Sequence, residues 1–238
     1  MIDNTEVLGK YKFSVIIPVL HEEDRINSLI EHLHTLEGRK NSETIVVDGS
    51  AAKDTINAIN DEKVISISSE KGRAKQMNAG AFIAQGEILV FLHADTKLPK
   101  EAFRKISEVL ENDKYVGGAF NLGIDSDKII FKLISYTTSF LSRLTRIPYG
   151  DQTIFIRKNY FDRIGRYNDV PVMEDAELMW RVSRRRGRIC IIKGNVKTSP
   201  RRWEKKGIIY TSLINQMIRV LYFFGVSPHR LIKIYRRQ

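Results

Sequence analysis

Residues 87–96 read EILVFLHADT, and this stretch decides how the first half of the chain folds. A short apolar run of this kind is typical of a buried strand. It ends abruptly in a histidine, an alanine, an acid and a threonine. A turn would explain the carboxylate of Asp95, and so would a bound metal ion. The rest of the sequence has to distinguish these two explanations.

Similar strand patterns come before this stretch and alternate with helical patterns. The strand-like runs are FSVIIPV at 13–19, ETIVVDGS at 43–50 and KVISISS at 63–69. The helical patterns occupy 20–38, 52–60, 72–86 and 99–112, with Gly86 expected as a helix cap. Short connections and strands too apolar to face water predict an α/β fold, with a mostly parallel central sheet flanked by helices.

Ligands of such sheets bind at the carboxyl ends of the strands. His21, Glu22, Asp48 and Asp95 all follow directly on strand patterns. Magnesium and manganese are usually held by few carboxylates and shared with substrate phosphates. Asp48 and Asp95, with His93 two residues before Asp95, are therefore candidates for a site that holds such an ion against a diphosphate. An acid that only forms a turn is the alternative at each position.

The pattern changes after about residue 115. A strand is expected at 115–124, a long helix at 128–146, a strand followed by a helix at 152–165, and a helix at 173–187. Two short strands at 188–200 and two helical stretches complete the chain. No linker rich in proline, glycine or serine separates the halves. We therefore expect a single domain over 1–238, with a nucleotide-binding half at 1–119 and a second half at 120–238 that ends in a helical C-terminal extension.

The bulk composition limits the protein class. A chain of 238 residues with 42% hydrophobic content can form a sizeable core. The lone cysteine, Cys190, excludes a disulfide within the chain. The N-terminus lacks a long apolar region, and no charge-free apolar stretch of about 18 residues occurs. We therefore expect no signal peptide, no transmembrane helix and a cytoplasmic location.

Charge is distributed unevenly along the chain. Residues 1–119 hold 15 Lys and Arg against 19 Asp and Glu, whereas residues 120–238 hold 24 against 9. A basic half suggests phosphate-bearing partners, an anionic membrane surface or nucleic acid. A solvated basic face is the plain alternative. With the apolar helices at 128–146 and 207–225, this half favours peripheral contact with the inner face of the cell membrane and makes a lipid acceptor an option.

Further polar clusters could carry chemistry. KGRAKQMNAG at 71–80 places cations near a helix start, where an anion is favoured. The acidic pair Glu174 and Asp175 opens a helix, and one of the two could act as a general base. The helix dipole alone would also favour acids there. GDQT at 150–153 and SPRRWEKKG at 199–207 add polar, cationic and aromatic side chains.

Taken together, these motifs are familiar. Their order and spacing resemble those of a family-2 glycosyltransferase of the GT-A type. The resemblance runs from about Phe13 to about Trp203, and the motifs that carry it are SVIIPVLHEE, IVVDGS, GRAKQMNAG, FLHADT, GDQTIFIRK, MEDAELMWR and RRW. Small bacterial members without membrane spans are the most similar. The resemblance implies a GT-A-like fold and an inverting transfer of a sugar from a nucleotide-diphosphate donor to an acceptor hydroxyl or carboxyl.

The resemblance also implies site residues. Asp95, the last acid of the family's D-x-D, would ligate Mn²⁺ or Mg²⁺, and Asp175, with Glu174 beside it, would be the base that deprotonates the acceptor in the second half. The nucleotide-sugar would be bound by Pro18, His21, Glu22, Asp48, Gly49, Arg73, Lys75, Asn78, His93, Ala94, Asp151, Gln152, Arg201, Arg202 and Trp203.

The sequence departs from the family pattern at two places. His93 stands where the first acid of D-x-D is expected, a position that mainly faces the ribose in the family. The Q-x-x-R-W element of processive synthases is only partly present, and no spanning helix is expected. The resemblance therefore favours a single transfer over polymer synthesis.

Two other functions fit parts of the sequence. A sugar-phosphate nucleotidyltransferase shares the α/β half and the metal, but it usually carries a glycine-rich basic loop after the first strand, where this chain reads VLHEEDR. A non-enzymatic module that binds nucleic acid or membrane would use the basic half and leave the strand-end acids without a role. We expect no nucleic acid partner, because Asp48 and Asp95 would repel a phosphate backbone.

Overall fold

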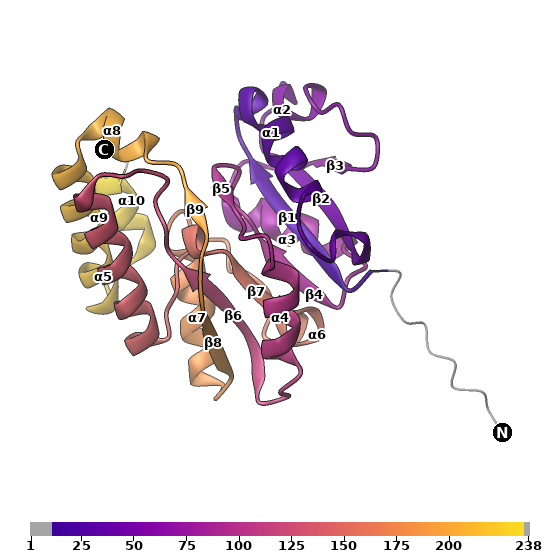
Figure 1. Cartoon of the computed structure of the whole chain (residues 1–238). Helices are drawn as coiled ribbons and strands as arrows, with labels where there is room; N and C mark the ends of the chain where they lie inside the picture. The colour runs from indigo at the N-terminus through magenta and orange to yellow at the C-terminus, as the bar shows by residue number, and fades with distance from the viewer. Residues whose placement is uncertain (1–10, 236–238) are drawn as a thin grey trace.

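The computed structural model describes residues 11–235, so the expectation about a signal peptide falls partly outside the described residues. A seven-stranded sheet in the order β3-β2-β1-β4-β7-β6-β8 runs through the molecule (Figure 1). Its strands are β1 (Phe13–Val19), β2 (Ser42–Asp48), β3 (Ile65–Ser68), β4 (Ile88–Phe91), β6 (Tyr115–Asn121), β7 (Ile154–Arg157) and β8 (Arg188–Asn195).

Most neighbouring strands of this sheet are parallel. The first four in chain order, β1 to β4, pair only in parallel with one another. β7 is antiparallel to both of its neighbours, β4 and β6, and β6 pairs in parallel with β8. The predicted mostly parallel sheet is confirmed, and the reversed strand β7 joins its two halves.

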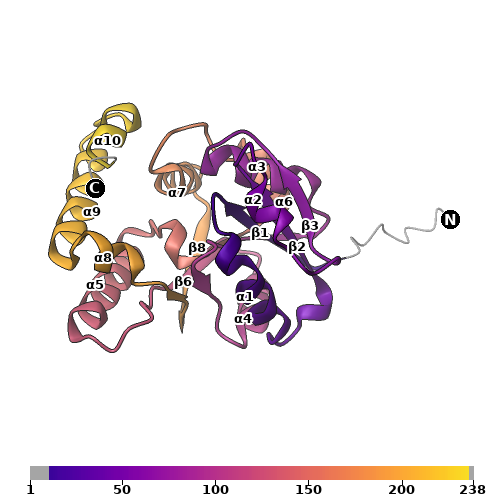
Figure 2. The same cartoon turned by 90° about the horizontal axis from the view of Figure 1, so that it is seen from above.

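Helices cover both faces of the sheet (Figure 2). On one face, α1 (Glu23–His34) and α4 (Ala102–Leu110) bury their apolar residues against β1 and β4. On the other face lie α3 (Arg73–Ile83), α6 (Lys158–Arg163) and α7 (Glu174–Arg184). The short α2 (Asp54–Asn57) is one turn long, and the 3₁₀ segments η1 (Arg39–Asn41) and η2 (Gly150–Gln152) lie in connections.

The sequence predicts Gly86 as a helix cap, and this prediction is wrong. α3 ends at Ile83, and Ala84 follows in the capping position. Gly86 instead lies against β1, where a Cβ would come within 2.6 Å of the backbone carbon of Phe13. Its N–H donates to the hydroxyl of Ser14 at 2.8 Å. The glycine therefore allows close packing between this turn and the first strand.

The helical C-terminal extension is confirmed, and it forms a layer beside the sheet (Figures 1 and 2). It consists of α8 (Arg201–Lys206), α9 (Ile208–Phe223) and α10 (Pro228–Tyr235), and α5 (Ile129–Thr145) lies with it. Three helices close the chain where two were predicted, because Gly207, with φ of 92°, separates α8 from α9. None of the helices within residues 11–235 has both the length and the apolarity to cross a bilayer.

Candidate active site

The carboxyl end of β4 leads directly into the candidate site. His93, Ala94 and Asp95 follow this strand, and the two-stranded pair β5 (Thr96–Lys97) and β9 (Lys197–Thr198) begins immediately afterwards. The N–H of Ser199 donates to the backbone oxygen of Asp95 at 2.9 Å. This pairing fixes the strand-end loop against the segment that precedes α8, and it brings the two halves of the chain together at Asp95.

A cavity of about 420 Å³ opens at this edge of the sheet, and we call it the strand-end cavity. The ends of β1 and β4 and the start of α3 form most of its wall. Its lining includes the predicted residues Pro18, Glu22, Arg73, His93, Ala94 and Asp95. The structure therefore brings these six residues together at one edge of the sheet, and their contact with a nucleotide-sugar stays a prediction.

A second cavity, of about 280 Å³, adjoins the first, and we call it the carboxylate cavity. Arg73, His93, Asp95 and Tyr235 line both cavities, so the two spaces are continuous. The predicted residues that line the carboxylate cavity are Arg73, His93, Asp95, Asp151, Asp175, Arg202 and Trp203.

Asp175 lies in the first turn of α7 and is held by backbone donors. Its Oδ2 accepts a hydrogen bond from the N–H of Gly150 at 2.5 Å, and its Oδ1 accepts one from Ala176 at 2.7 Å. A Cβ at Gly150 would lie 2.6 Å from Nε2 of His93 and 3.3 Å from Oδ2 of Asp175. Gly150 thus leaves the space in which the imidazole and the carboxylate approach each other.

Glu174, the other acid of the predicted pair, faces a different partner. Its Oε1 lies 2.8 Å from Nε of Arg73, and its side chain is only 3% exposed. Burial raises the pKa of Glu174, while the Arg73 guanidinium opposes the shift, and Glu174 in turn raises the pKa of Arg73. Glu174 therefore orients Arg73, and Asp175 is the acid of the pair that lines the cavity.

Asp151 places a third carboxylate at the carboxylate cavity. Its Oδ1 is buried and has no hydrogen-bond partner. Burial raises the pKa of Asp151 to about 6 against the opposing effect of Arg219, and the neighbouring carboxylates of Asp175 and Asp95 add to the rise. Burial, followed by the charge of Arg73, lowers the pKa of His93, so its imidazole is neutral at neutral pH.

The acidic side chains suit a divalent cation that also binds substrate. Within residues 11–235, no group of three or more His, Cys, Asp or Glu side chains is arranged to hold a metal ion by itself. Asp95, Asp151 and Asp175 nevertheless line one cavity, and Asp151 has an unpartnered oxygen there. This donor set fits an ion bound through few carboxylates and completed by phosphate oxygens.

Several predicted binding residues line neither cavity, because their polar atoms bind backbone. The buried carboxylate of Asp48 accepts from the N–H groups of Ser50 at 2.7 Å and Ile56 at 3.3 Å, as a turn-forming acid does. Asn78 pairs through both amide atoms with the backbone of Tyr167. Their contact with a nucleotide stays a prediction.

Gln152 is fully buried, away from both cavities. Its Oε1 accepts from the hydroxyl of Ser142 at 2.7 Å, and its Nε2 donates to the backbone oxygen of Phe120 at 3.0 Å. These hydrogen bonds connect η2 to α5 and β6, and so they fix the backbone next to Asp151. The structure gives Gln152 a positioning contact, and a direct contact with the donor remains untested.

His21, Gly49 and Lys75 also line neither cavity. His21 is exposed and bonds Asp54 at 2.5 Å, and Lys75 pairs with Glu70 at 2.5 Å and Asp169 at 3.5 Å. Gly49 lies against the side chain of Gln76, which itself lines the strand-end cavity.

Arg201 and Trp203 come from α8, on the far side of the site. Arg201 donates at 3.0 Å to Glu22, which lines the strand-end cavity. Trp203 is buried against Phe131 of α5, with 6.1 Å between the ring centroids. Only part of Trp203 therefore faces the carboxylate cavity.

Sequence reasoning did not select Tyr149, Arg219 or Tyr235 as site residues, although all three line the carboxylate cavity. The guanidinium of Arg219 lies 3.8 Å from the ring centroid of Tyr149. Arg202 donates to the hydroxyl of Tyr235 at 2.6 Å. Arg219 is the one cation in the apolar stretch 208–223, and this isolation was the signal that could have identified it.

The fold and the acidic cavity at its strand ends define a GT-A-like glycosyltransferase. The mannosyltransferase PcManGT from Pyrobaculum calidifontis, solved with GDP-Man and Mn²⁺, superposes with a TM-score of 0.61 at 17% identity, covering 78% of this chain and 56% of that chain. TarS 1-349 of S. aureus, solved with UDP-GlcNAc, gives 0.61 at 18% identity, with coverages of 79% and 58%. At these identities the likeness shows the fold alone.

The family follows from the sequence match. The model for Glycosyl transferase family 2 matches residues 14–168, and the chain belongs to this family. The dolichol-phosphate mannosyltransferase of Saccharomyces cerevisiae is 26% identical over 167 residues, which cover 63% of this chain and 62% of the relative. The protein of the same name from Pyrococcus furiosus is 27% identical over 143 residues, covering 56% and 41%. This chain thus matches less than two thirds of the length of either relative.

Proposed function

We propose that the protein transfers a sugar from a nucleotide-diphosphate donor to an acceptor, with inversion at the anomeric carbon. The observation that carries this proposal is the position of Asp175. Its carboxylate lines a cavity that is continuous with the strand-end cavity through Arg73, His93 and Asp95. Membership of glycosyl transferase family 2 supports the same reaction class.

The donor fits the strand-end cavity with its diphosphate toward Asp95. Arg73 lines both cavities and Arg202 lines the adjoining one, so both are cations available to the diphosphate. Asp95 would hold Mn²⁺ or Mg²⁺, and the ion supplies charge neutralisation for the departing diphosphate. Glu174 holds the Arg73 guanidinium in place from behind, so this cation is oriented before the donor binds.

Asp175 would act as the general base on the acceptor. The acceptor oxygen attacks the anomeric carbon from the side opposite the diphosphate, its proton passes to Asp175, and the bond between the sugar and the diphosphate breaks. The two backbone N–H donors on Asp175 fix the direction of its carboxylate, which a base needs in order to reach the acceptor hydroxyl.

We also propose that the helical layer touches an anionic membrane at its surface. α5 exposes a stripe of apolar side chains, Ile129, Leu133, Tyr136, Phe140 and Leu144. α9 exposes Ile209, Leu213, Met217 and Val220, and the exposed Phe224 directly follows this helix. Their spacing of three or four residues places each set on one face of its helix. Exposed Lys132 and Arg146 add positive charge at α5. An apolar face with basic neighbours suits an anionic lipid surface.

A thermal-shift panel tests the donor and metal part of the proposal. UDP, GDP, CDP, dTDP and ADP, each with Mn²⁺, Mg²⁺ or EDTA, are compared on the wild type and on Asp95→Ala. We expect one nucleotide to stabilise the wild type only with metal, because a ligand that binds the folded state raises its stability. We expect Asp95→Ala to lose this effect. No shift with any nucleotide would contradict the proposal.

Product analysis separates the proposed reaction from its nearest rival. A glycosyltransferase releases a nucleoside diphosphate, whereas a sugar-phosphate nucleotidyltransferase exchanges a nucleoside triphosphate and pyrophosphate. Release of pyrophosphate from a nucleoside triphosphate and a sugar phosphate would favour the rival.

A further inference from the structure

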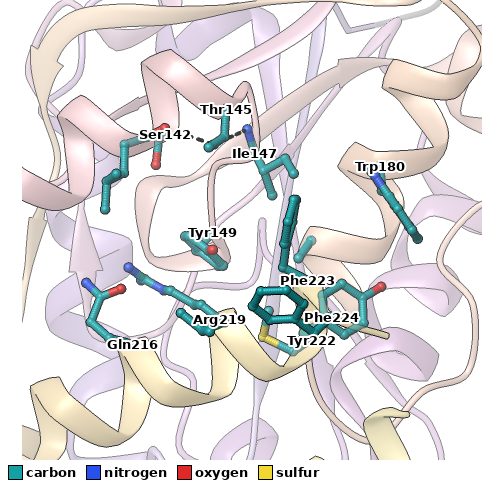
Figure 3. A pocket seen from close by; sticks show the side chains of 14 residues that line it. Ser142, Thr145, Ile147, Tyr149, Trp180, Gln216, Arg219, Tyr222, Phe223 and Phe224 are labelled. Carbon is teal, nitrogen blue, oxygen red and sulfur yellow. Dashed lines mark hydrogen bonds between the residues drawn. The ribbon is translucent and has the colours of Figure 1, made fainter. Parts of the chain in front are cut away.

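A third cavity, of about 250 Å³, lies beside the carboxylate cavity and is almost entirely apolar (Figure 3). It opens between the end of α5, one side of α7 and the second half of α9. Its apolar lining includes Leu141, Ile147, Ala176, Trp180, Val220 and Phe223. We call it the apolar cavity. The chemistry described above does not use it.

The apolar cavity leads to the candidate base. Tyr149, Met173 and Arg219 line both the apolar and the carboxylate cavity. On α7, Asp175 lines the carboxylate cavity and the next residue, Ala176, lines the apolar one. A molecule extending from one cavity into the other would therefore pass directly beside Asp175, on the side of the site away from the strand-end cavity.

Arg219 places a cation at this junction. Figure 3 shows its side chain next to Tyr149, on the side of the cavity away from Trp180. Arg219 stacks on Tyr149 at 3.8 Å, and its charge opposes the rise in the pKa of Asp151, but within residues 11–235 it forms no salt bridge. Arg219 does not line the strand-end cavity. Its donors thus suit an oxygen of the acceptor.

The outer end of the apolar cavity meets the exposed stripe of the helical layer. Val220, Phe223 and Phe224 line the cavity and are 53%, 74% and 77% exposed. An apolar chain could therefore lie partly in the cavity and partly along the surface. Ligand pockets usually start at about 300 Å³, so this cavity holds only a segment of a long chain.

We infer that the acceptor is a lipid, whose apolar chain enters the apolar cavity and whose polar end, carrying the acceptor oxygen, lies between Arg219 and Asp175. This inference rests on the proposed function and names its acceptor class. An apolar chain matches the lining, a polar end matches the Arg219 cation at the junction, and the opening onto an exposed apolar stripe gives the lipid a route from a membrane.

The test compares a cavity-filling variant with a matched control on the same helix. Val220→Trp fills the apolar cavity from its exposed side, and Tyr210→Trp places the same ring on α9 outside both the cavity lining and the exposed stripe. The probes are a fluorescent single-chain lipid for binding, and a prenyl alcohol, its monophosphate and a short water-soluble alcohol for transfer. Acceptor-free hydrolysis of the nucleotide-sugar and nucleotide binding report on the donor site.

We expect Val220→Trp to weaken lipid binding and transfer by about tenfold, because it excludes roughly two methylene groups from the cavity. Tyr210→Trp should match the wild type, and both variants should keep nucleotide binding and donor hydrolysis. Better transfer to the alcohol or to the monophosphate then identifies the polar end. Arg219→Gln should weaken transfer to the monophosphate more than transfer to the alcohol.

Two results would overturn the inference. One is unchanged lipid binding in Val220→Trp, and the other is equal transfer to the short alcohol and the prenyl acceptors. Absence of nucleotide binding and donor hydrolysis in the wild type would instead overturn the proposed function. The two failures are therefore distinguished by the donor measurements alone.

Discussion

The carboxylate cavity and the apolar cavity share a wall at α7, yet they are built differently. Hydrogen bonds and ion pairs fix the side chains around the carboxylate cavity, as the two backbone donors on Asp175 and the Arg73–Glu174 pair show. The apolar cavity is formed by packing, and much of its outer wall is exposed. Rigid polar geometry suits a reaction that needs fixed atoms, whereas an apolar wall tolerates variation in a bound chain.

Asp175→Asn gives the largest expected effect and tests the rigid side of this comparison. The amide keeps the shape of the side chain but cannot accept the acceptor proton. We expect turnover to fall by about 100-fold or more, with nucleotide binding nearly unchanged. Rates of nucleoside diphosphate release, measured with thermal shifts by the nucleotide, check this. Loss of nucleotide binding along with turnover would mean that Asp175 is structural.

Glu174→Gln is the neighbouring control, and it should act on stability. Removing this carboxylate leaves Arg73 without its buried partner. Because the Arg73 side chain is 40% exposed, we expect a loss at the lower end for broken buried pairs, about 3 kcal/mol in the free energy of unfolding. Denaturant unfolding measures it. A variant that is inactive but keeps wild-type stability and nucleotide binding would move the base role toward Glu174.

The contrast between these two acids also shows where sequence reasoning stops. Successive residues of a helix point about 100° apart, so adjacent acids at a helix start reach different surroundings. The acidic pair was identifiable from the sequence. Which acid binds an arginine and which lines the cavity was not, because this depends on the position of Arg73 from α3. Strand-end residues such as Asp95 were predictable because parallel strands end at one edge.

The role of Asn78 and the existence of the apolar cavity could not be predicted from the sequence. Asn78 has the same polar atoms as a ligand-binding residue, but they pair with the backbone of Tyr167. The apolar cavity combines α5, α7 and α9, and each helical pattern alone looks like a core-facing surface. The predicted single domain over 1–238 stays a prediction.

Asp151→Asn tests the carboxylate cavity through the pH dependence of the free energy of unfolding. The pKa of Asp151 in the folded protein is about 6, above its ordinary value of 3.8, so folding is favoured with the proton bound. The stability from this group is complete below about pH 4 and is lost as the pH rises through 6. In EDTA, the wild type should therefore lose stability over this window relative to Asp151→Asn.

One pKa unit corresponds to about 1.4 kcal/mol, so the variant should gain at most about 3 kcal/mol at pH 7, and contact with solvent reduces this. Unfolding by denaturant at several pH values gives the difference between the two proteins. A constant difference from pH 4 to pH 7 would show that Asp151 does not titrate in this range. Added Mn²⁺ should stabilise the wild type more than the variant if the carboxylate faces the bound ion.

The exposed stripe of the helical layer should give the smallest effect. The double variant Leu133→Ser/Ile209→Ser removes one apolar side chain each from α5 and α9, and neither residue lines the apolar cavity. Partial burial of such side chains in a membrane surface contributes about 1 kcal/mol, so we expect roughly fivefold weaker binding to anionic vesicles.

Phe82→Ser, which removes an exposed ring from α3, is the matched control and should bind as the wild type does. Vesicle flotation at low and high salt measures both, and binding should weaken with salt because cations contribute to it. An equal loss in the Phe82 variant would show that the stripe is not the contact surface, and then the lipid would have to reach the apolar cavity by another route.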